Sequence, residues 1–528
     1  MTSLLDVLRR SADRYPEAVA LAPVPGSGSG WSYAQLRALV ERGAALLESM
    51  GVAPGDRVLL DLEPCAAWPA ALFAILEAGL VAVPLAADTP LASAAGVAAL
   101  AGARLAVLGN RTSGLAAVCK DVHCLAVEQL FQAESTTRRR ERRPVPELAL
   151  LAFTSGSTRE PRAVELTHAN LLANLQSLLQ VRRASPGDSF LSMLPPAHLF
   201  ELMAGLLAPL ACGARVVYAT SLLPHRVLEG LREGRITHAL SVPALLDVLY
   251  EEVVNELVDA GAAQSTVRGQ SLAETARRLQ EELDAAERER LRESVRERIG
   301  TSFHTLVVGG AALDPAWAVV TEAVGVRLEV GYGLTEAGPI VSVGLASECP
   351  PRSAGRPLPS VEVKVGENGE ILVRGPNIMR GYFRDPASTA AVLQDGWLRT
   401  GDHGRIDGSG FLFISGRHKE ALKTAAGETL YPEEVESYYD SPLFAERCVT
   451  GLPGPHGNDL PTLFVVPACR DTSEEELLRA FEDLRAAAPS RFRVADMVLL
   501  SEPLPRTPIG KVRRRSVARQ WQERGALP

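Results

Sequence analysis

The 528-residue sequence is poor in aromatic side chains and has no ordered cysteine pattern. Phe, Trp and Tyr together make up 5% of its residues. Its seven cysteines are scattered, with no Cys-x-x-Cys pair and no Cys/His spacing suited to zinc. A disulfide-rich scaffold and a zinc finger therefore find no support. Unpaired cysteines are typical of reducing compartments, so we predict a cytoplasmic protein.

A long apolar run and a strong charge of one sign are also missing. The most apolar stretch, Ala66 to Ala86, is interrupted by Pro69, Glu77 and Pro84, which indicates a buried helix and strand rather than a membrane span. The amphipathic N-terminus lacks the apolar core and cleavage site of a signal peptide. The net charge of -8 gives no sign of a nucleic-acid partner.

Apolar residues make up 46% of a chain that is too long for a single core, so at least two domains are expected. Amphipathic helices and short apolar strands alternate through the first 340 residues, a pattern typical of parallel sheets covered by helices. The clearest predicted helices are Tyr33–Gly51, Ala66–Ala78, Leu171–Leu179, Leu199–Leu210 and a surface helix, continuous or broken, over Leu272–Ile299. The clearest predicted strands are Asp56–Asp61, Val81–Pro84, Arg104–Leu108, Ser189–Leu194 and Arg215–Tyr218.

The pattern changes at Val361, where alternating strands are separated by tight glycine turns, which predicts an antiparallel, barrel-like region. A small α/β segment follows Lys419. We therefore predict an α/β fold with an N-terminal domain of two βα-layered subdomains and a barrel-like subdomain over residues 1–418. A small, mobile α/β domain is expected over residues 419–528.

One predicted strand, Leu148–Phe153, runs directly into a hydroxyl-rich loop, and a helix is expected to begin near Thr167 or Asn170. Backbone N–H groups and Ser/Thr hydroxyls in such a loop can cradle phosphate oxygens. A plain polar turn is the alternative for this run taken alone. The proposed phosphate-binding residues are Thr154, Ser155, Gly156, Ser157 and Thr158.

Four further segments follow this loop in a fixed order. They are Gly331-Tyr-Gly-Leu-Thr-Glu336, Thr400-Gly-Asp402, Gly416-Arg-His-Lys-Glu420 and the Pro508-Ile-Gly-Lys511 loop near the C-terminus. With the hydroxyl-rich loop, they closely resemble the adenylate-forming superfamily of acyl-CoA synthetases, peptide-synthetase adenylation domains and luciferases. The resemblance covers nearly the whole chain. It implies a ligase that activates a small-molecule carboxylic acid with ATP and Mg²⁺ to an acyl-adenylate, which then usually passes to a thiol.

The resemblance also implies roles for individual residues. Tyr332 would stack on adenine, Thr335 would bond a phosphate and Glu336 would hold magnesium, for which a carboxylate is a suitable hard ligand. Asp402 and Arg417 would bind ribose. The backbone bordering adenine would be that of Gly309, Gly310, Ala311 and Gly333.

Lys511 is the residue we expect to assist the first step. Negative charge builds on the transferring phosphate when a carboxylate attacks the α-phosphorus, and a cation aimed at that charge lowers the barrier. The resemblance places a hinge at Lys419, and places Gly427 beside the tunnel for the thiol.

The phosphate loop departs from the family pattern, which usually continues Thr-Gly-x-Pro-Lys-Gly-Val. Here Arg159 and Ala163 replace glycines and Arg162 replaces the lysine. Arginine keeps the charge and can bind phosphate in bidentate fashion, so we expect Arg162 to take the catalytic role of the lysine. The added side chains restrict the backbone.

The nature of the acid is indicated by Leu194-Pro-Pro-Ala-His-Leu-Phe-Glu201, which resembles a segment of long-chain fatty acyl-CoA synthetases. His198 and Gly331 would then flank the acyl pocket, although His198 could equally support the entry to a helix. The extra residue between Lys423 and Gly427 points to the same branch. A medium- or long-chain fatty acid, and hence a role in lipid metabolism, is therefore predicted.

The acceptor is expected to be coenzyme A, the usual thiol of the family. An acyl-carrier protein, or a product such as a β-lactone made through the adenylate, remains an alternative. A degenerate nucleotide- or acyl-binding protein without turnover is the second class of function. It is favoured only by the altered phosphate loop, whereas Glu336, Asp402, Arg417 and Lys511 all remain.

Overall fold

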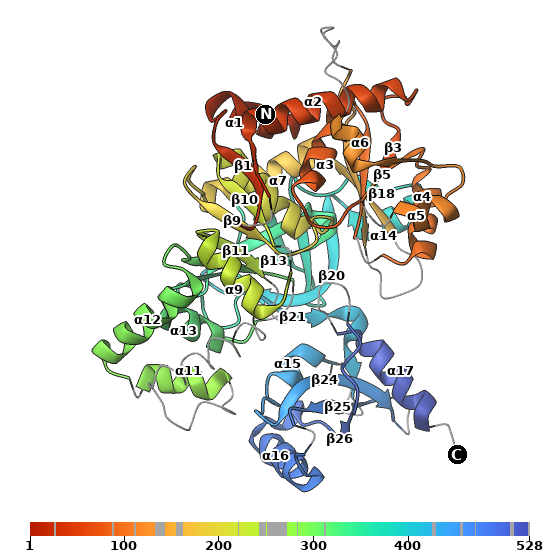
Figure 1. Ribbon diagram of the computed structural model, residues 1–528. Helices are drawn as coiled ribbons and strands as arrows, with labels where there is room; N and C mark the ends of the chain where they lie inside the picture. The colour runs from red at the N-terminus through yellow and green to blue at the C-terminus, as the bar shows by residue number, and fades with distance from the viewer. Residues whose placement is uncertain are drawn as a thin grey trace.

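The computed structural model has a large N-terminal part and a smaller C-terminal part, which lies below it in Figure 1. It describes residues 1–25, 28–86, 89–109, 112–132, 143–154, 162–219, 221–241, 246, 250, 272–281, 283–310, 313–424, 429–454, 458–469, 471–506 and 512–525. The arrangement matches the predicted α/β fold with two parts of unequal size.

The first sheet of the N-terminal part has the order β18-β8-β7-β4-β3-β5-β6. Its parallel centre confirms the predicted apolar strands, because β3 and β4 are buried on both faces and carry Val, Leu and Ala. The strands are β3 (Arg57–Asp61), β4 (Val81–Leu85), β5 (Leu105–Leu108), β6 (His123–Ala126), β7 (Leu148–Thr154), β8 (Arg162–Thr167) and β18 (Gly381–Tyr382). The accompanying helices are α2 (Tyr33–Ser49), α3 (Ala67–Glu77), α4 (Leu91–Ala101), α5 (Thr112–Val118) and α6 (Val127–Gln132).

The sequence did not predict β8, and this corrects the expected layout of the phosphate loop. β7 and β8 pair antiparallel with Thr154 opposite Arg162, so the loop between them joins two strands rather than a strand and a helix. The helix α7 (His168–Val181) starts only after β8. Its start near Thr167 is confirmed by a reciprocal cap, in which Thr167 and Asn170 bond each other's backbone N–H groups. Ala163 lies inside β8, where no glycine is needed.

The second sheet has the order β15-β14-β13-β12-β11-β9-β10-β1-β2 and is parallel from β13 through to β1. Its strands are β1 (Val19–Pro23), β2 (Trp31–Ser32), β9 (Ser189–Ser192), β10 (Arg215–Tyr218), β11 (His238–Ser241), β12 (Thr305–Val308), β13 (Arg327–Gly333), β14 (Ile340–Leu345) and β15 (Arg356–Pro357). The helices α1 (Leu5–Arg14), α9 (Pro224–Glu233) and α13 (Ala316–Ala323) lie between strands of this sheet in the sequence or just before its first strand.

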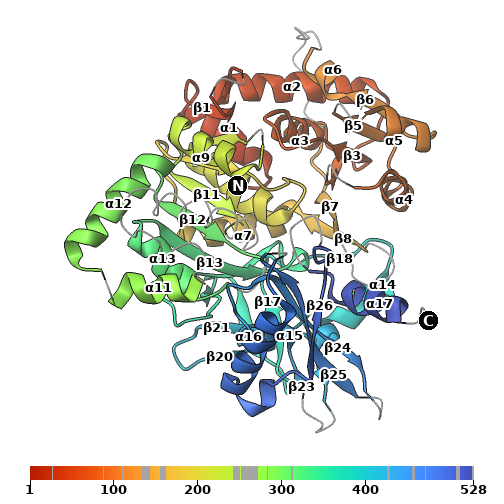
Figure 2. The same cartoon turned by 60° about the horizontal axis from the view of Figure 1, so that its bottom comes forward.

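Two predicted helices differ in detail from the structure. The surface helix is broken, as the sequence allowed: α11 (Leu272–Glu281) ends and α12 (Ala285–Ile299) begins after Asp284, whose side chain accepts from the N–H of Glu287. The helix expected over Leu199–Leu210 begins as the π-helix η1 (Glu201–Leu207) and becomes α-helical only at α8 (Ala208–Cys212). In Figures 1 and 2, α11 and α12 lie on the opposite side of the molecule from α4 and α5.

The third sheet is antiparallel, as predicted, with the order β16-β17-β20-β19 and β21 also paired to β20. Its strands are β16 (Glu362–Val365), β17 (Glu370–Arg374), β19 (Leu393–Gln394), β20 (Trp397–Ile406) and β21 (Leu412–Arg417). The helix α14 (Pro386–Val392) and the short helix η2 (Thr335–Ala337) lie in the segments between strands. Within the described ranges the pairing follows an open path, so the sheet is not a closed barrel.

The C-terminal part has its own core. Leu430, Tyr439, Val449, Leu463 and Phe481 belong to a buried cluster made entirely of residues after Glu420. The elements are η3 (His418–Glu420), β22 (Leu422–Lys423), β23 (Thr429–Leu430), α15 (Pro432–Glu436), β24 (Phe444–Pro453), β25 (Asp459–Pro467), α16 (Glu474–Ala487), η4 (Ser490–Phe492), β26 (Asp496–Leu499) and α17 (Arg514–Gly525).

Among the helices that the structure describes, none is both long and apolar enough to cross a membrane.

Candidate active site

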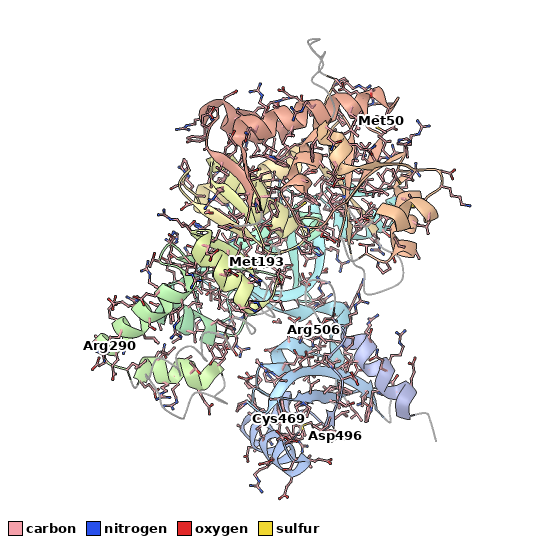
Figure 3. All side chains as sticks on the ribbon, viewed as in Figure 1. Met50, Met193, Arg290, Cys469, Asp496 and Arg506 are labelled. Atoms are coloured by element: carbon pink, nitrogen blue, oxygen red, sulfur yellow. The ribbon has the colours of Figure 1, made fainter. Side chains whose placement is uncertain are left out.

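A large cleft of about 2130 Å³ runs between the N-terminal and C-terminal parts. Residues from both parts line it. Arg162, Glu336 and Tyr382 contribute from the N-terminal part, whereas Arg506 and Arg514 contribute from the C-terminal part. In Figure 3, Arg506 lies on the side of the C-terminal part that faces the rest of the molecule. The cleft therefore brings together segments that are far apart in the sequence, and most of the predicted site residues that the structure describes lie along it or beside it.

The predicted adenine and ribose residues contact one another. The Tyr332 hydroxyl donates a hydrogen bond to Oδ2 of Asp402 at 2.6 Å, and Nε of Arg417 lies 3.3 Å from Oδ1 of the same carboxylate. Burial raises the pKa of Tyr332 well above its usual value, and the neighbouring Asp402 raises it further. Tyr332 is therefore held neutral in a fixed position. A carboxylate has about four acceptor sites, and the predicted ribose role of Asp402 would need one of them.

A second chain of contacts joins the predicted phosphate and magnesium residues. The Tyr382 hydroxyl donates to Oε1 of Glu336 at 2.9 Å, and the Arg162 guanidinium lies 5.2 Å from the centre of the Tyr382 ring. Thr335 precedes Glu336 in η2 and also lines the cleft. Arg162, Tyr382 and Glu336 come from β8, β18 and η2, so these three elements bring a cation and a carboxylate to the same tyrosine.

At two positions of the site only glycine fits, because the neighbouring backbone comes very close to the glycine Cα. A Cβ built on Gly333 would lie 2.1 Å from the Pro339 carbonyl oxygen, and one on Gly331 would lie 3.0 Å from the Ser342 carbonyl oxygen. The antiparallel pairing of β13 with β14 thus depends on these residues. Gly309 and Gly310 follow β12 and line the cleft next to Gly331 on the neighbouring strand. These residues add no side chain to this wall, as the predicted approach of a planar ring to the backbone requires.

Several predicted residues lie outside the described residues. They are Ser155, Gly156, Ser157, Thr158, Arg159, Ala311, Gly427 and Lys511. Thr154 is the last residue of β7, and only its backbone is described. The roles of Thr154 and of the residues outside the described ranges remain predictions.

The ends of the Lys511 segment are described and lie at the cleft. Arg506 and Val512 form an antiparallel bridge, and both line the cleft. The predicted hinge residue Lys419 lines the cleft as well, within the short helix η3 that follows Arg417. The fold thus places the predicted hinge and the two ends of the Lys511 segment on the same cleft.

The predicted acid pocket extends the cleft away from the glycine wall. His198 lines it, together with the apolar side chains of Phe200, Ala204, Val307 and Val343. Beyond them the wall becomes charged. Nε of Arg182 lies 3.0 Å from Oε1 of Glu329, two residues before Gly331 on β13. Burial raises the pKa of Glu329, and Arg182 opposes that effect.

Three functional or buried polar residues were not singled out from the sequence. Tyr382 follows Gly381 in a two-residue strand that carries no recognisable pattern of its own. Arg514 is the middle residue of three consecutive arginines, a run that is typical of a solvated surface, but it is 9% exposed and lies 3.3 Å from Glu420. Glu201 was quoted only as part of a resemblance, yet it is 1% exposed. For Arg514 and Glu201 the long-range packing, which no local pattern reveals, decides the environment.

The residues present fit a magnesium–nucleotide complex. Glu336 faces the cleft as a carboxylate, and its contact with Tyr382 engages Oε1. Glu336 would hold the ion, and Arg162 would stand nearby as the phosphate-binding cation. Bound Mg²⁺ neutralises phosphate charge during the transfer step.

Comparison with known proteins points to the same family as the sequence motifs. Residues 8–383 match the family described as AMP-binding enzyme. The chain is 30% identical to feruloyl-CoA synthase from Amycolatopsis sp. over 97% of this chain and 98% of the relative. It is 27% identical to a long-chain-fatty-acid–CoA ligase from Bacillus subtilis over 72% of this chain and 63% of the relative.

A solved structure supports the fold. The O-succinylbenzoate coenzyme A synthetase from Bacillus subtilis, in complex with AMP, has a TM-score of 0.79 and 23% identity, covering 97% of this chain and 98% of that chain. ATP, Mg²⁺ and CoA are the cofactors of such ligases. The chain therefore belongs to the AMP-binding enzyme family, within the adenylate-forming superfamily, and is an AMP-forming acid–thiol ligase.

Proposed function

We propose that the acid activated by this ligase has a compact apolar body, either a medium-chain alkyl group or an aryl group. The observation that carries this proposal is the change from apolar to charged lining within the acid pocket. Phe200, Ala204, Val307 and Val343 provide an apolar space beside Gly331. The Arg182–Glu329 ion pair then adds a charged stretch to the same wall.

The length of the apolar space follows from strand geometry. Glu329, Gly331 and Gly333 alternate on β13 and therefore point to one face, and two residues along a strand span about 7 Å. An aryl ring or much of a medium-length alkyl chain fits that span. A long alkyl chain has to pass the ion pair, and moving apolar carbon against charged groups is unfavourable. The proposal therefore keeps the medium-chain part of the fatty-acid prediction and disfavours the long-chain part.

The relatives named above are compatible with either choice, since one is a feruloyl-CoA synthase and another a long-chain-fatty-acid–CoA ligase. CoA is the acceptor we propose, with an acyl-carrier protein as the alternative. The seven cysteines are all free thiols, as a reducing compartment favours, and a cytoplasmic location remains a prediction.

The test is pyrophosphate release and acyl-CoA formation over a panel of acids that includes acetate, octanoate, cinnamate, ferulate and palmitate. We expect octanoate or an aryl acid to exceed palmitate in kcat/KM by about tenfold or more. Replacing CoA with a holo acyl-carrier protein decides the acceptor. Palmitate as the best substrate would overturn the proposed acid class, and background release with every acid would support the binding-protein alternative.

A double variant tests whether the ion pair sets the limit. Arg182→Ala together with Glu329→Ala removes both charges and so avoids leaving one unpaired in a partly buried site. We expect this variant to gain activity on longer acids relative to octanoate. Glu322→Ala, on the exposed surface of α13, is the matched control and should leave the chain-length profile unchanged.

A further inference from the structure

A second cluster of metal-ligating side chains lies at the opposite end of the second sheet from the glycine wall. Asp188 directly precedes β9, His238 is the first residue of β11, and His304 directly precedes β12. β11 pairs parallel with both β9 and β12, so the amino ends of three adjacent strands meet here. One ligand atom from each of the three side chains lies within 4.8 Å of those of the other two.

Hydrogen bonds around Thr237 orient the His238 ring. The Thr237 hydroxyl accepts from the backbone N–H of Ser189 at 2.9 Å, and it lies 3.1 Å from the Ser189 carbonyl oxygen and 2.8 Å from Nδ1 of His238. A hydroxyl has one proton, so when that proton goes to Ser189, Nδ1 donates to Thr237 and Nε2 presents its lone pair. Nε2 of His238 is the nitrogen that would bind an ion in this arrangement.

His304 is held in a similar way. Its Nδ1 lies 2.9 Å from the Thr305 hydroxyl, which also accepts from Nη2 of Arg327 at 3.2 Å. Nη2 of Arg327 also lies 3.4 Å from Nδ1 of His304, and a guanidinium can only donate, so Arg327 has to move away from Nδ1 before that nitrogen can donate to Thr305 and leave Nε2 as the ligand atom. Metal-binding histidines commonly use the second nitrogen in this manner, to fix the orientation and tautomer of the ring.

The three side chains are held in place as well as lying close together. The His238 ring stacks on Phe190 with centroids 4.4 Å apart and meets His304 edge-on at 4.9 Å. Oδ2 of Asp188 accepts from the N–H of Ser185 at 2.6 Å, which orients the carboxylate. All three side chains are partly buried, so little freedom remains to be lost on binding an ion.

We propose that Asp188, His238 and His304 form a site for a divalent transition metal of the zinc type. Two imidazoles and one carboxylate are a donor set suited to Zn²⁺, and three protein ligands leave a fourth position for water. Magnesium, which prefers oxygen ligands, is not the ion that this set selects. His238 and Arg327 also line the far end of the cleft, so the ion would lie beside the acid pocket. The proposal does not depend on which acid is activated.

The positive charge of Arg327 opposes cation binding at this site, since its guanidinium lies next to His304. Asp188 offsets that charge. Arg327→Gln should therefore tighten metal binding, whereas loss of a ligand should weaken it. These opposite directions distinguish a metal site from general damage to the fold, because an unfolded variant cannot bind more tightly.

The experiment is a titration of the metal-free full-length protein with Co²⁺, followed by displacement with Zn²⁺. One equivalent should bind and give the visible bands of four-coordinate Co²⁺. His238→Ala and His304→Ala should each weaken binding by about tenfold or more, and Arg327→Gln should strengthen it. His225→Ala, an exposed histidine on α9, is the matched control.

Each outcome decides the proposal. Wild-type protein that binds no stoichiometric Co²⁺, or that gives only a six-coordinate spectrum, overturns it without any variant. The same holds if His225→Ala reduces binding as much as His238→Ala, because surface histidines would then account for the ion. Thermal unfolding with and without Zn²⁺ gives a second readout, since an ion that binds only the native state must raise its Tm.

Discussion

The Arg515 guanidinium donates a hydrogen bond to the main-chain carbonyl of Lys419 at 3.0 Å. Arg515 lies four residues after Lys511, and Lys419 is the predicted hinge. The neighbouring Arg514 is buried, lies 3.3 Å from Glu420 and 3.7 Å from Glu433, and also pairs with Glu436. The start of α17 is therefore tied to the segment that leaves the N-terminal part, so motion at the hinge and displacement of the Lys511 segment should be coupled.

The first prediction concerns that hinge. If Lys511 acts on the α-phosphate in the first half-reaction, as predicted, the thiol still has to reach the acyl carbon in the second, and one rigid arrangement can hardly serve both. Lys419→Pro fixes φ near -65°. We expect this variant to form acyl-AMP within about tenfold of the wild-type rate and to lose most thioester formation. The two rates are measured by pyrophosphate release and by acyl-CoA formation from pre-made acyl-AMP.

Lys419→Ala separates the role of the backbone from that of the side chain. It removes the ammonium group without restricting φ, so thioester formation should persist. Lys419→Pro protein that transfers acyl groups to CoA at the wild-type rate would contradict the hinge and the two-conformation mechanism.

The second prediction concerns Lys511. Lys511→Ala should slow adenylation by about 10²-fold or more, which is the usual effect of removing a preorganised cation from a charged transition state. Thioester formation from pre-made acyl-AMP should change much less. Lys120→Ala, an exposed lysine in the N-terminal part, is the control for charge loss. Equal losses in both half-reactions would assign Lys511 a structural role.

The third prediction concerns Arg162, which stands over the Tyr382 ring at 5.2 Å. If Arg162 replaces the family's lysine at the β- or γ-phosphate, Arg162→Ala should raise the KM for ATP while leaving the KM for the acid unchanged. Arg162→Lys should recover part of the effect, because it restores the charge but not the bidentate geometry. An ATP dependence identical to wild type would rule out this role.

Tyr382→Phe is a matched variant for the same contact chain. It keeps the ring beneath Arg162 but removes the hydroxyl that donates to Glu336. We expect it to change the Mg²⁺ dependence of adenylation more than the ATP dependence, since its missing bond is to the predicted magnesium ligand. Identical metal and ATP titrations in Tyr382→Phe and wild type would show that the bond to Glu336 does not position the carboxylate for magnesium.

Much of the fold was predictable because local patterns decide it. The apolar strands β3, β4, β5 and β10 lie where the sequence placed them, since buried parallel strands are continuous apolar runs. The break between α11 and α12 was also anticipated. β8 was missed because its Arg-Ala-Val-Glu-Leu-Thr sequence is short and its partner β7 lies across the phosphate loop. The connection from Thr154 to Arg162 is longer than the short turns by which a hairpin is recognised in a sequence.

The site was predictable to the extent that its motifs are contiguous. Tyr332, Asp402 and Arg417 were identified separately, and the structure brings them within hydrogen-bonding or ion-pairing distance. Tyr382 and the Arg182–Glu329 pair were not foreseen, because they gain their environment from chain segments far away in sequence. The same reason explains η1, whose π-helical geometry depends on how its side chains pack rather than on helix propensity.

The fourth prediction concerns Glu201, a carboxyl group in the buried face of η1. Its side chain is 1% exposed, and burial raises its pKa from 4.5 to about 8, with the Ser192 hydroxyl offsetting part of the effect. A Cβ on Gly205 would lie 2.5 Å from Oε1 of Glu201, so the glycine makes room for the carboxyl group inside the helix. At neutral pH Glu201 is therefore mainly protonated in the folded protein.

The sign of the pH dependence follows from these two values. The folded pKa lies above the unfolded one, so Glu201 contributes its full stability below about pH 4.5 and loses it as the pH rises through about 8. The slope reaches at most about 1.4 kcal/mol per pH unit between those limits. Glu201→Gln does not ionise and lacks this dependence. We expect its Tm relative to wild type to increase between pH 5 and about pH 8 and then to level off.

Comparing Tm differences at each pH removes the contribution of other titrating groups, because those groups are the same in both proteins. Glu322→Gln, at an exposed position, should show a constant difference from wild type over the same range. A Glu201→Gln difference that is equally flat would mean that Glu201 is ionised or solvated in the folded protein. Because an amide retains the volume of the carboxyl group, a uniform loss of stability at every pH would instead report a packing defect and would also contradict the assigned protonation state.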